Sequence, residues 1–326
     1  MIPLKIVSTG VAVPAQQVTS AELDVRLGFP NGYVQRRSGV VHRYHAGARE
    51  SQSELAAKAL HAALARGDIA PGSIDLLISA CGVQEQALPS TAAHVLAASR
   101  LRAGMPAFDV GASCLSFLMA LQVAAGLLHS GAHKRIAIVS SDLASRGVDW
   151  SNPEASLIFG DGAAAAIVEA GDGTTGIASC LFETYPAGRA LCEIRAGGTR
   201  RNPRVGVEPD DFHFRMDGKR VFRMVSKLMD AFMDRLLGAR GLSIQDIDTV
   251  VPHQASHLSM LHIRERLGVP ASSVIDIYAH RGNQVAASMP TALHEAMVTG
   301  RASPGSRLLM LGTAAGLTLG GMVLST

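Results

Sequence analysis

The chain reads Phe108-Asp109-Val110-Gly111-Ala112-Ser113-Cys114 at the point where a short strand pattern passes, through small residues, into a long apolar helix. The helix is predicted over Leu115 to Leu128, in which Ser116 and Gln122 are the only polar side chains. A surface helix keeps one polar face, whereas a helix that is apolar nearly all round is buried on all sides. We therefore expect this helix inside the molecule, with Cys114 at its start.

Strand and helix patterns alternate on both sides of this segment. Helices are predicted over Ser51 to Arg66, where Ser51 and Glu54 fit a capping box, and over Thr91 to Leu101. Short β-branched and apolar runs predict the strands Leu4–Ser8, Ile74–Ala80, Ala107–Val110, Arg135–Ser140 and Ala163–Val168. This alternation is typical of an α/β fold.

The second half of the chain repeats the order of strand, loop, helix and strand, which indicates an internal duplication. A long amphipathic helix is expected over about 218–237, after a connecting segment over Ala187 to Phe214, which we call the excursion. Residues Leu308 to Leu324 are predicted to form two strands around a tight turn. The other predicted elements are the strands Thr249–Val251, Val274–Ile277 and Arg307–Leu311 and the helices Leu258–Leu267 and Ala287–Val298.

The composition excludes several classes of protein. Of the 326 residues, 48% are hydrophobic and 17% are charged, which excludes a disordered chain. A formal net charge of +3 and an aromatic content of 4% predict no nucleic-acid surface. No run reaches the roughly 20 apolar residues of a membrane helix, and Met1 to Ala15 is predicted to contain a first strand rather than a signal peptide. Four cysteines without Cys-x-x-Cys spacing predict a cytoplasmic protein with reduced thiols and no zinc site.

Cys114 is the first candidate for chemistry, because its segment places a thiol at a helix N-terminus. Unpaired backbone N–H groups and the helix dipole favour a thiolate there. The alternative is a buried cysteine that acts as a small hydrophobic residue. The remaining cysteines lack this setting and are expected to be structural: Cys81, Cys180 and Cys192.

Two polar residues of the second half are further candidates. His253 follows a predicted strand, where a histidine can be a general base or donate to a developing oxyanion, or simply be a hydrogen-bonded loop residue. His257 follows four residues later, but no third metal ligand is evident, so we predict no metal. Asn283 stands in a glycine-containing turn, and its amide can stabilise an enolate or cap the turn.

The glycines are informative as well. Gly160-Asp161-Gly162 lies between apolar runs and most simply makes a hairpin turn. Gly312-Thr313-Ala314-Ala315-Gly316 can bring backbone N–H groups close to a substrate oxygen. Neither fits a phosphate-cradling loop, so nucleotide hydrolysis and nicotinamide chemistry have no support.

Together these motifs resemble the β-ketoacyl-acyl carrier protein synthase III group of the thiolase superfamily, over essentially the whole chain and in the same order. The resemblance rests on the Asp-Val-x-x-x-Cys segment at Cys114, the His-Gln-Ala motif at His253 and the Gly-Asn-x-x-Ala-Ala-Ser-x-Pro motif at Asn283. Phe159-Gly160-Asp161-Gly162-Ala163 matches another signature, and Arg37 with Gly39 matches an early Arg-Thr-Gly-Ile region.

The resemblance implies a fold and a mechanism. The fold is a five-layered αβαβα sandwich of two similar halves, here 1–172 with the nucleophilic cysteine and 173–326 with the histidine and asparagine, and it is usually dimeric. Cys114 would take an acyl group, with its own backbone N–H and that of Ala315 as the oxyanion hole. His253 and Asn283 would then stabilise the enolate from a decarboxylating malonyl-thioester, which attacks the acyl group to give a β-ketoacyl thioester. Acyl-CoA or acyl-carrier-protein donors serve as substrates, and no cofactor is implied.

Departures from the family pattern concern the substrate. Tyr33 replaces a tryptophan that stacks on the adenine of coenzyme A, and Asn152-Pro153-Glu154 offers no arginine to pair with it. Leu88 replaces a phenylalanine that closes the primer pocket, which would admit a longer or branched acyl chain. Leu258 stands where the family has an arginine that meets the carrier protein, and basic residues on the preceding helix are the predicted substitutes: Lys219, Arg220, Arg223 and Lys227.

Two rival functions are compatible with the sequence. One is a family member that transfers its acyl group to a hydroxyl or amine in secondary metabolism, without carbon–carbon bond formation. Relatives of that kind often carry an aspartate where Asn283 stands, so Asn283 favours condensation. The other is an inactive partner subunit, which the joint presence of Cys114, His253 and Asn283 opposes.

Overall fold

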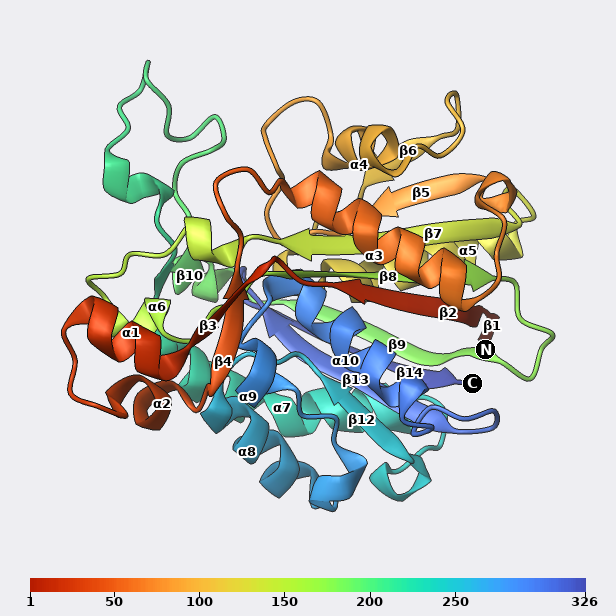
Figure 1. The fold of residues 1–326 in the computed structure, drawn as a ribbon. Coiled ribbons are helices and arrows are strands. Elements are labelled where there is room, and N and C mark those ends of the chain that lie inside the picture. Colours follow the sequence, from red (N-terminus) through yellow and green to blue (C-terminus); the bar gives the residue numbers. More distant parts are fainter.

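A computed structural model describes residues 1–326 as two five-stranded sheets separated and covered by helices (Figure 1). The first sheet has the order β2 (Lys5–Ala12), β8 (Gly162–Glu169), β7 (Arg135–Asp142), β5 (Leu76–Ser79) and β6 (Ala107–Asp109). Strand β5 is parallel to both of its neighbours, while β8 is antiparallel to β7 and β2. All five strands predicted in the first half are therefore confirmed, with ends that differ by a few residues.

The second sheet draws on both ends of the chain. Its order is β1 (Ile2–Pro3), β9 (Gly176–Thr184), β14 (Thr318–Ser325), β13 (Arg307–Ala314) and β12 (Thr249–Pro252). Strands β13 and β14 form the predicted pair around a tight turn at residues 315–317. Strand β1 pairs with β9, so the first residues of the chain belong to the sheet of the second half. The division of the chain at residue 172 stays a prediction.

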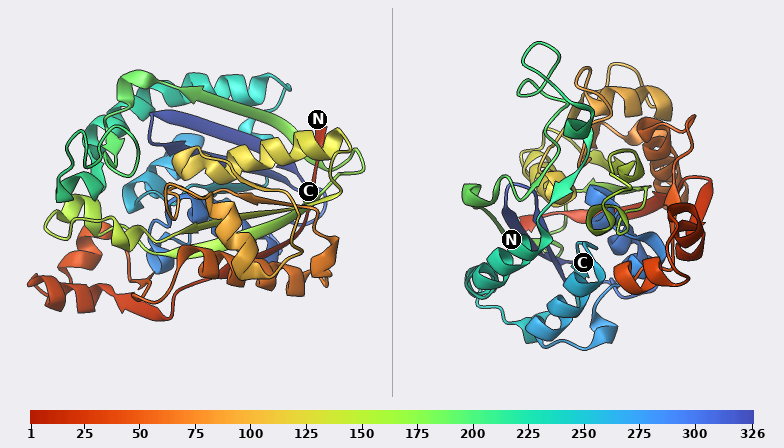
Figure 2. Two further views of the ribbon diagram at one scale, coloured as in Figure 1. Left: turned by 90° about the horizontal axis from the view of Figure 1, so that it is seen from above. Right: turned by 90° about the vertical axis from the view of Figure 1, so that its left-hand side faces the viewer.

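The helices complete five layers, which are seen in two further directions in Figure 2. Helices α5 (Ser116–His129) and α10 (Ser288–Val298) lie between the sheets and contact both of them. Helices α3 (Gln52–Arg66) and α4 (Thr91–Ser99) cover the outer face of the first sheet, and α7 (Gly218–Gly238) and α8 (His257–Leu267) that of the second. The predicted αβαβα sandwich is confirmed, and so is the burial of the apolar helix after Cys114.

Both sheets follow one topology, which supports the expected duplication. In chain order, the strands of the first sheet run first, fifth, fourth, second and third. The second sheet repeats this order from β9, except that its third strand is reduced to a bridge between Val250 and Val274. The strand predicted over Val274 to Ile277 is therefore wrong beyond its first residue, for a reason given below.

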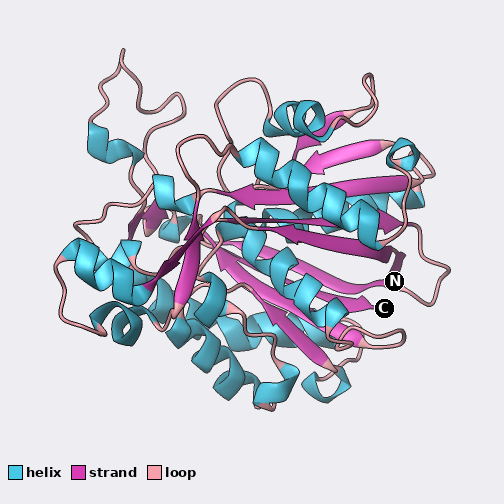
Figure 3. Cartoon of the chain, in the orientation of Figure 1, coloured by secondary structure: helices cyan, strands magenta, loops and turns pink.

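Smaller helices and strands lie at one end of the sandwich (Figure 1 and Figure 3). Strands β3 and β4 form a two-stranded sheet beside α1 and α2, and β10 pairs with β11 at the base of the predicted excursion. Ser51 and Glu54 form the predicted capping box of α3. The remaining bounds are β3 (Gln16–Thr19), β4 (His42–His45), β10 (Cys192–Glu193), β11 (Arg215–Met216), α1 (Ser20–Leu27), α2 (Tyr33–Ser38), α6 (Pro153–Ser156) and α9 (Tyr278–Arg281). None of the helices is long and apolar enough to cross a membrane.

Candidate active site

Cys114 lies in a single 3-10 turn, Ser113–Leu115, between β6 and the buried helix α5. Ser113 has a positive φ of 52°, a conformation that non-glycine residues seldom adopt and that clusters at functional sites. The Ser116 hydroxyl fixes the turn, since it donates to the Ser113 carbonyl (2.7 Å) and accepts from the Ala112 N–H (2.8 Å). The thiol therefore stands just ahead of the first helical residue, on a rigid turn.

The electrostatics of Cys114 differ from the prediction based on the helix N-terminus. Burial raises the pKa of the thiol to about 12, and the negative charge of Asp142 adds to that rise. The backbone N–H groups of Cys114 and Ala315 act in the opposite direction, because they donate toward the sulfur and favour the thiolate. Burial therefore outweighs the thiolate-favouring effect expected of the helix N-terminus, while the two backbone N–H groups predicted for the oxyanion hole, those of Cys114 and Ala315, lower the pKa of this thiol.

His253 follows β12 directly and is almost completely buried. Its backbone N–H donates to the Leu311 carbonyl (2.9 Å), which ties the histidine to the neighbouring strand β13. Burial lowers the pKa of the imidazole to about 4, and its Nδ1 has no hydrogen-bond partner within the chain. A neutral imidazole in a dry site can donate to a developing negative charge or accept a proton.

His257 has a separate place from His253. It is the first residue of α8, and its side chain packs against Gly39, where an added Cβ would lie 2.6 Å from the His257 Cβ. Within the chain, no group of three or more His, Cys, Asp or Glu side chains is placed to hold a metal ion.

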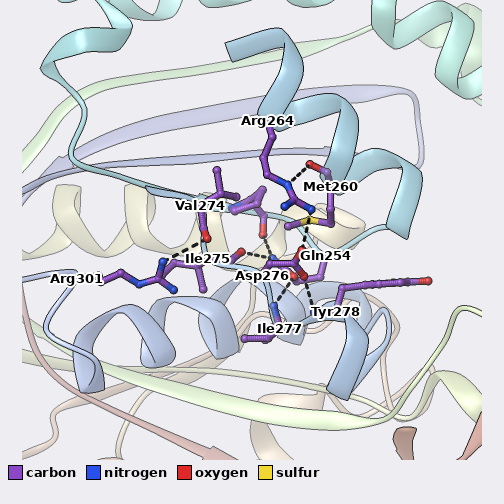
Figure 4. A network of polar contacts seen from close by, with 10 residues as sticks. Gln254, Met260, Arg264, Val274, Ile275, Asp276, Ile277, Tyr278 and Arg301 are labelled. Carbon is purple, nitrogen blue, oxygen red and sulfur yellow. Dashed lines mark hydrogen bonds and ion pairs between the residues drawn. The ribbon is translucent and has the colours of Figure 1, made fainter. Parts of the chain in front are cut away.

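Gln254 is a site-building residue that the sequence analysis did not assign a role (Figure 4). Its buried Nε2 donates to the carbonyls of Pro252 (2.9 Å) and Ile275 (3.1 Å), and its Oε1 accepts the N–H of Ile277 (3.1 Å). One side chain thus satisfies the backbone groups that a regular strand over residues 275–277 would pair with β12. This explains why the predicted strand is absent and why the loop carrying His253 is fixed.

The network in Figure 4 continues through the acidic residue next to that segment. Asp276 accepts the N–H of Tyr278 (3.1 Å) and pairs with Arg264 on α8 (3.3 Å). Arg301 donates to the carbonyls of Ser272 (2.7 Å) and Val274 (3.4 Å). Apart from the bridge between Val250 and Val274, the segment that leads into α9 is therefore held by side chains rather than by a sheet.

Asn283 is buried and its side chain has one orientation. Its Oδ1 accepts the N–H of Val285 (2.8 Å), and one Nδ2 hydrogen goes to the Ala255 carbonyl (3.2 Å), so the second Nδ2 hydrogen remains free to donate. The backbone of Asn283 exchanges hydrogen bonds with Ile158 (2.8 Å) and Gly160 (3.1 Å).

The Gly160-Asp161-Gly162 hairpin predicted from the glycines is wrong, because β7 and β8 are joined by a long connection that includes α6. Both glycines are instead required by close packing, Gly160 against the Arg281 carbonyl and Gly162 against the Gln284 side chain. The buried Asp161 carboxylate accepts from the backbone N–H groups of Ala46 (2.7 Å) and Ser145 (2.8 Å). The motif therefore holds the Asn283 turn in place.

The three predicted residues converge through the elements that carry them. The turn of Cys114 packs against β13 and against the 3-10 turn Val285–Ala287, which follows Asn283. On β13, Gly312 lies between His253 and Leu115, since an added Cβ would come within 2.8 Å of the His253 Cβ and 3.1 Å of the Leu115 Cδ2. The turn of Cys114, which follows a strand of the first sheet, thus lies beside the segments that carry His253 and Asn283.

The predicted substrate residues lie outside this buried centre. Tyr33 begins α2 and one face of its ring packs on Phe29, with centroids 4.5 Å apart. Arg37 is exposed, and Leu88 is 84% exposed in the loop before α4, so in one chain it is not a buried wall of the site. Lys219 and Arg223 line a surface hollow of about 490 Å³ on α7, whereas Arg220 points to Asp217 (3.9 Å) instead.

Comparisons with known proteins identify the family. The family model described as 3-oxoacyl-[acyl-carrier-protein] synthase III matches residues 108–186, and the model for the C-terminal part of the same family matches residues 237–326. A β-ketoacyl-[acyl-carrier-protein] synthase III of Streptomyces coelicolor is 35% identical over 323 residues, which cover 97% of this chain and 95% of the relative. A relative of the same name from Rhodospirillum rubrum is 35% identical over 321 residues, 97% of each chain.

Solved structures give the same result. The 3-oxoacyl-[acyl-carrier-protein] synthase III of Aquifex aeolicus superposes with a TM-score of 0.89 at 28% identity, covering 99% of this chain and 100% of that one. The synthase III of Thermus thermophilus has the same TM-score at 30% identity and covers 98% of both chains. The expected family is thereby confirmed: this chain belongs to the 3-oxoacyl-[acyl-carrier-protein] synthase III family of condensing enzymes, with their thiolase fold.

Proposed function

We propose that Cys114 is acylated by a thioester and that the acyl group then condenses with a malonyl-thioester. In the first step the sulfur attacks the thioester carbonyl, the donor C–S bond breaks, and the donor thiol leaves with the proton of Cys114. The observation that carries this proposal is the convergence of two backbone N–H groups, those of Cys114 and Ala315, on the one thiol that begins the central helix. These donors suit the oxyanion of the tetrahedral intermediate.

The second step needs donors for an enolate. Loss of carbon dioxide from the malonyl-thioester leaves a carbanion conjugated to a carbonyl, which attacks the acyl carbon and expels the Cys114 thiolate. His253 is held neutral by burial and Asn283 keeps one free amide hydrogen, so both can donate to the enolate oxygen without a full positive charge nearby. The product is a β-ketoacyl thioester.

The donor is proposed to be carried by an acyl carrier protein or by coenzyme A. The α7 hollow supports a carrier protein, because Lys219, Arg223 and Lys227 surround Phe222. Phe222 is 46% exposed, and the centroid of its ring lies 4.8 Å from that of His262. An acidic helix with an apolar face fits such a surface. Tyr33 and Arg37 are the proposed contacts of the nucleotide when coenzyme A is the donor, since Arg37 is exposed and makes no ion pair within the chain.

We also propose that the enzyme works as a homodimer in the cytoplasm without a metal or redox cofactor. The support for the dimer is a group of exposed apolar side chains at and beside the edge strand β6: Val83, Leu88 and Phe108. A second copy that covers this edge would bury them and pair the open strand. Leu88 would line an acyl pocket only in such a covered state.

Intact-protein mass spectrometry tests the first step. The native chain and the Cys114→Ala variant are incubated with a panel of acyl-coenzyme A and acyl-carrier-protein donors. An acyl adduct on the native chain alone supports the proposal and identifies the preferred donor. Adding a malonyl-thioester should then discharge the adduct with release of one carbon dioxide per acyl group. Discharge onto an alcohol or amine without that release would instead establish the alternative acyltransferase, and no adduct with any donor would contradict the proposed role of Cys114.

A charge reversal tests the carrier-protein surface separately. Arg223→Glu should raise KM for acyl-carrier-protein donors by about tenfold and leave KM for acyl-coenzyme A unchanged, because one rim charge acts on the encounter with the acidic partner. Arg215→Glu, an exposed arginine outside the hollow, is the matched control. An equal effect of both variants on both donors would contradict the surface.

A further inference from the structure

One buried carboxylate near the site has no cation beside it. Asp142 is the last residue of β7 and almost fully buried, yet it forms no ion pair. An unpaired charge in the interior is unfavourable by several kcal/mol unless hydrogen bonds compensate it. Burial accordingly raises the pKa of Asp142 to about 7. The hydrogen bonds that compensate this buried carboxylate identify the segments that it connects.

All hydrogen bonds of this carboxylate come from the backbone of two separate segments. Oδ1 accepts the N–H groups of Gly82 (2.9 Å) and Val83 (3.1 Å), just after β5. Oδ2 accepts the N–H groups of Ala286 (3.1 Å) and Ala287 (3.3 Å), in the turn that follows Asn283. One side chain thus fastens a loop of the first sheet to the Asn283 turn of the second half.

The clamped turn is strained and directly connected to Asn283. Val285 has a positive φ of 53°, which is unfavourable for a β-branched residue. Its N–H orients the Asn283 amide, and its side chain fills the space where a Cβ on Gly82 would stand. The bonds from Ala286 and Ala287 to Asp142 tie down the two residues that follow Val285, and they add to the bond from the Gln284 N–H to the Ser288 hydroxyl (2.9 Å).

From this geometry we infer that Asp142 is a positioning residue, which holds the Val285–Ala287 turn so that the free amide hydrogen of Asn283 faces the reacting carbonyl. The inference deepens the function proposed above and rests on the role given there to Asn283. It predicts a selective defect. Acylation of Cys114 does not use Asn283, so removal of Asp142 should impair malonyl decarboxylation far more than acyl transfer.

The test measures both steps in Asp142→Asn, with Asp75→Asn as the matched control. Asp75 likewise accepts backbone N–H groups, those of Lys134 (2.7 Å) and Arg135 (3.4 Å), but at the other end of β7. In Asp142→Asn we expect carbon dioxide release to fall by about 10- to 100-fold, as for a misplaced catalytic group, and acyl adduct formation to stay within about threefold. The control should change neither rate. An equal loss in both steps of Asp142→Asn would overturn the inference.

A double variant separates this inference from the proposed function. If Asp142 acts through Asn283, Asp142→Asn should slow decarboxylation by less than about twofold when added to Asn283→Ala, since residues that act as a unit are not additive. A full 10-fold loss on top of Asn283→Ala would overturn the inference while leaving Asn283 its role. Wild-type decarboxylation in Asn283→Ala alone would overturn the proposed role of Asn283, and the inference with it.

Two further measurements keep the test decisive if Asp142→Asn folds poorly. Gly82→Ala keeps the Asp142 carboxylate but places a Cβ 2.4 Å from the Val285 Cγ1 and 3.1 Å from the Asp142 Oδ1, so it should reproduce the selective loss of decarboxylation. Alkylation of Cys114 by iodoacetamide should become faster in Asp142→Asn, because the carboxylate raises the pKa of the thiol and its loss releases more thiolate. Unselective loss in Gly82→Ala, or slower alkylation in Asp142→Asn, would contradict the geometry on which the inference depends.

Discussion

Replacing Gly312 by Ala should damage both the stability and the rate of this enzyme. The added Cβ would lie 2.8 Å from the His253 Cβ, 3.1 Å from the Leu115 Cδ2 and 3.3 Å from the Met289 Cε. Met289 can move aside, but His253 is tied to Leu311 and Leu115 adjoins the nucleophile. Reaching an ordinary contact of 3.4 Å requires a displacement of about 0.6 Å between β13 and one of these residues.

The magnitude follows from two opposing effects on the free energy of unfolding. Overpacking a core typically destabilises by about 1–3 kcal/mol, while replacing a strand glycine gains roughly 0.5–1 kcal/mol. The net loss is therefore about 0–2.5 kcal/mol. A misplacement of 1 Å in a catalytic group can lower the rate about 100-fold, so a shift of 0.6 Å should lower kcat about 10- to 100-fold.

The assay compares Gly312→Ala with Gly126→Ala. Gly126 lies inside α5, and a Cβ there meets no atom within 4 Å. Gly126→Ala should therefore stabilise the protein by roughly 0.5–1 kcal/mol through helix propensity and leave kcat unchanged. Denaturant unfolding and the full condensation assay measure both quantities. A Gly312→Ala variant as stable and as active as the wild type would refute the placement of His253 and Leu115 on either side of β13.

Three more predictions concern the same centre. Gln254→Leu should destabilise the protein by roughly 3 kcal/mol or more in denaturant unfolding, because it leaves backbone groups of three residues unpaired in the interior; a loss under 1 kcal/mol would contradict the network of Figure 4. Alkylation of Cys114 should accelerate about tenfold per pH unit from pH 7 to about pH 10, since the reactive thiolate forms with a pKa of about 12, and a plateau near pH 8 would show that the thiol is not so buried. For His253 the folded pKa of about 4 lies below the ordinary 6.5, so the unfolded state binds the proton first and stability is lost as the pH falls from about 6.5 toward 4. His253→Asn should therefore lose roughly 2 kcal/mol less between pH 7 and pH 5 than the wild type, and equal losses would place His253 in solvent.

The sequence predicts most of the fold because its signals are local. Ser51 and Glu54 cap a helix whatever surrounds them, and the run after Cys114 is too apolar to lie on a surface. The strand over Val274 to Ile277 fails for a non-local reason. The side chain of Gln254, twenty-one residues before Ile275, bonds to the Ile275 carbonyl in place of a neighbouring strand. No pattern within residues 274–277 indicates that a side chain will do so.

The active site also has features that the sequence predicts and features that it does not. Cys114, His253 and Asn283 are chosen from residue type, position after a strand and family resemblance, and the structure brings their elements together. The pKa of the thiol is not predictable from the local sequence, because burial outweighs the backbone N–H groups of Cys114 and Ala315, which favour the thiolate. Asp142 is not predicted from the sequence, because Ser-Ser-Asp at the end of a strand resembles the start of an ordinary loop. The signal that could have indicated it is an acidic residue at the end of an otherwise apolar strand.

The central layer of α5 and α10, which both sheets share, has a consequence for folding during synthesis on the ribosome. Helix α5 is synthesised early, but its apolar surface packs on β9 and β14, which are synthesised later. Strand β2, near the N-terminus, likewise packs on α10, near the C-terminus. At about 5–20 residues per second, the 154 residues after position 172 take roughly 8–30 s to synthesise. During that interval the nascent first half displays the inner face of its sheet and helix uncovered. The central layer can therefore pack only after nearly the whole chain has been synthesised. A chain truncated before α10 should bind chaperones and should have no activity.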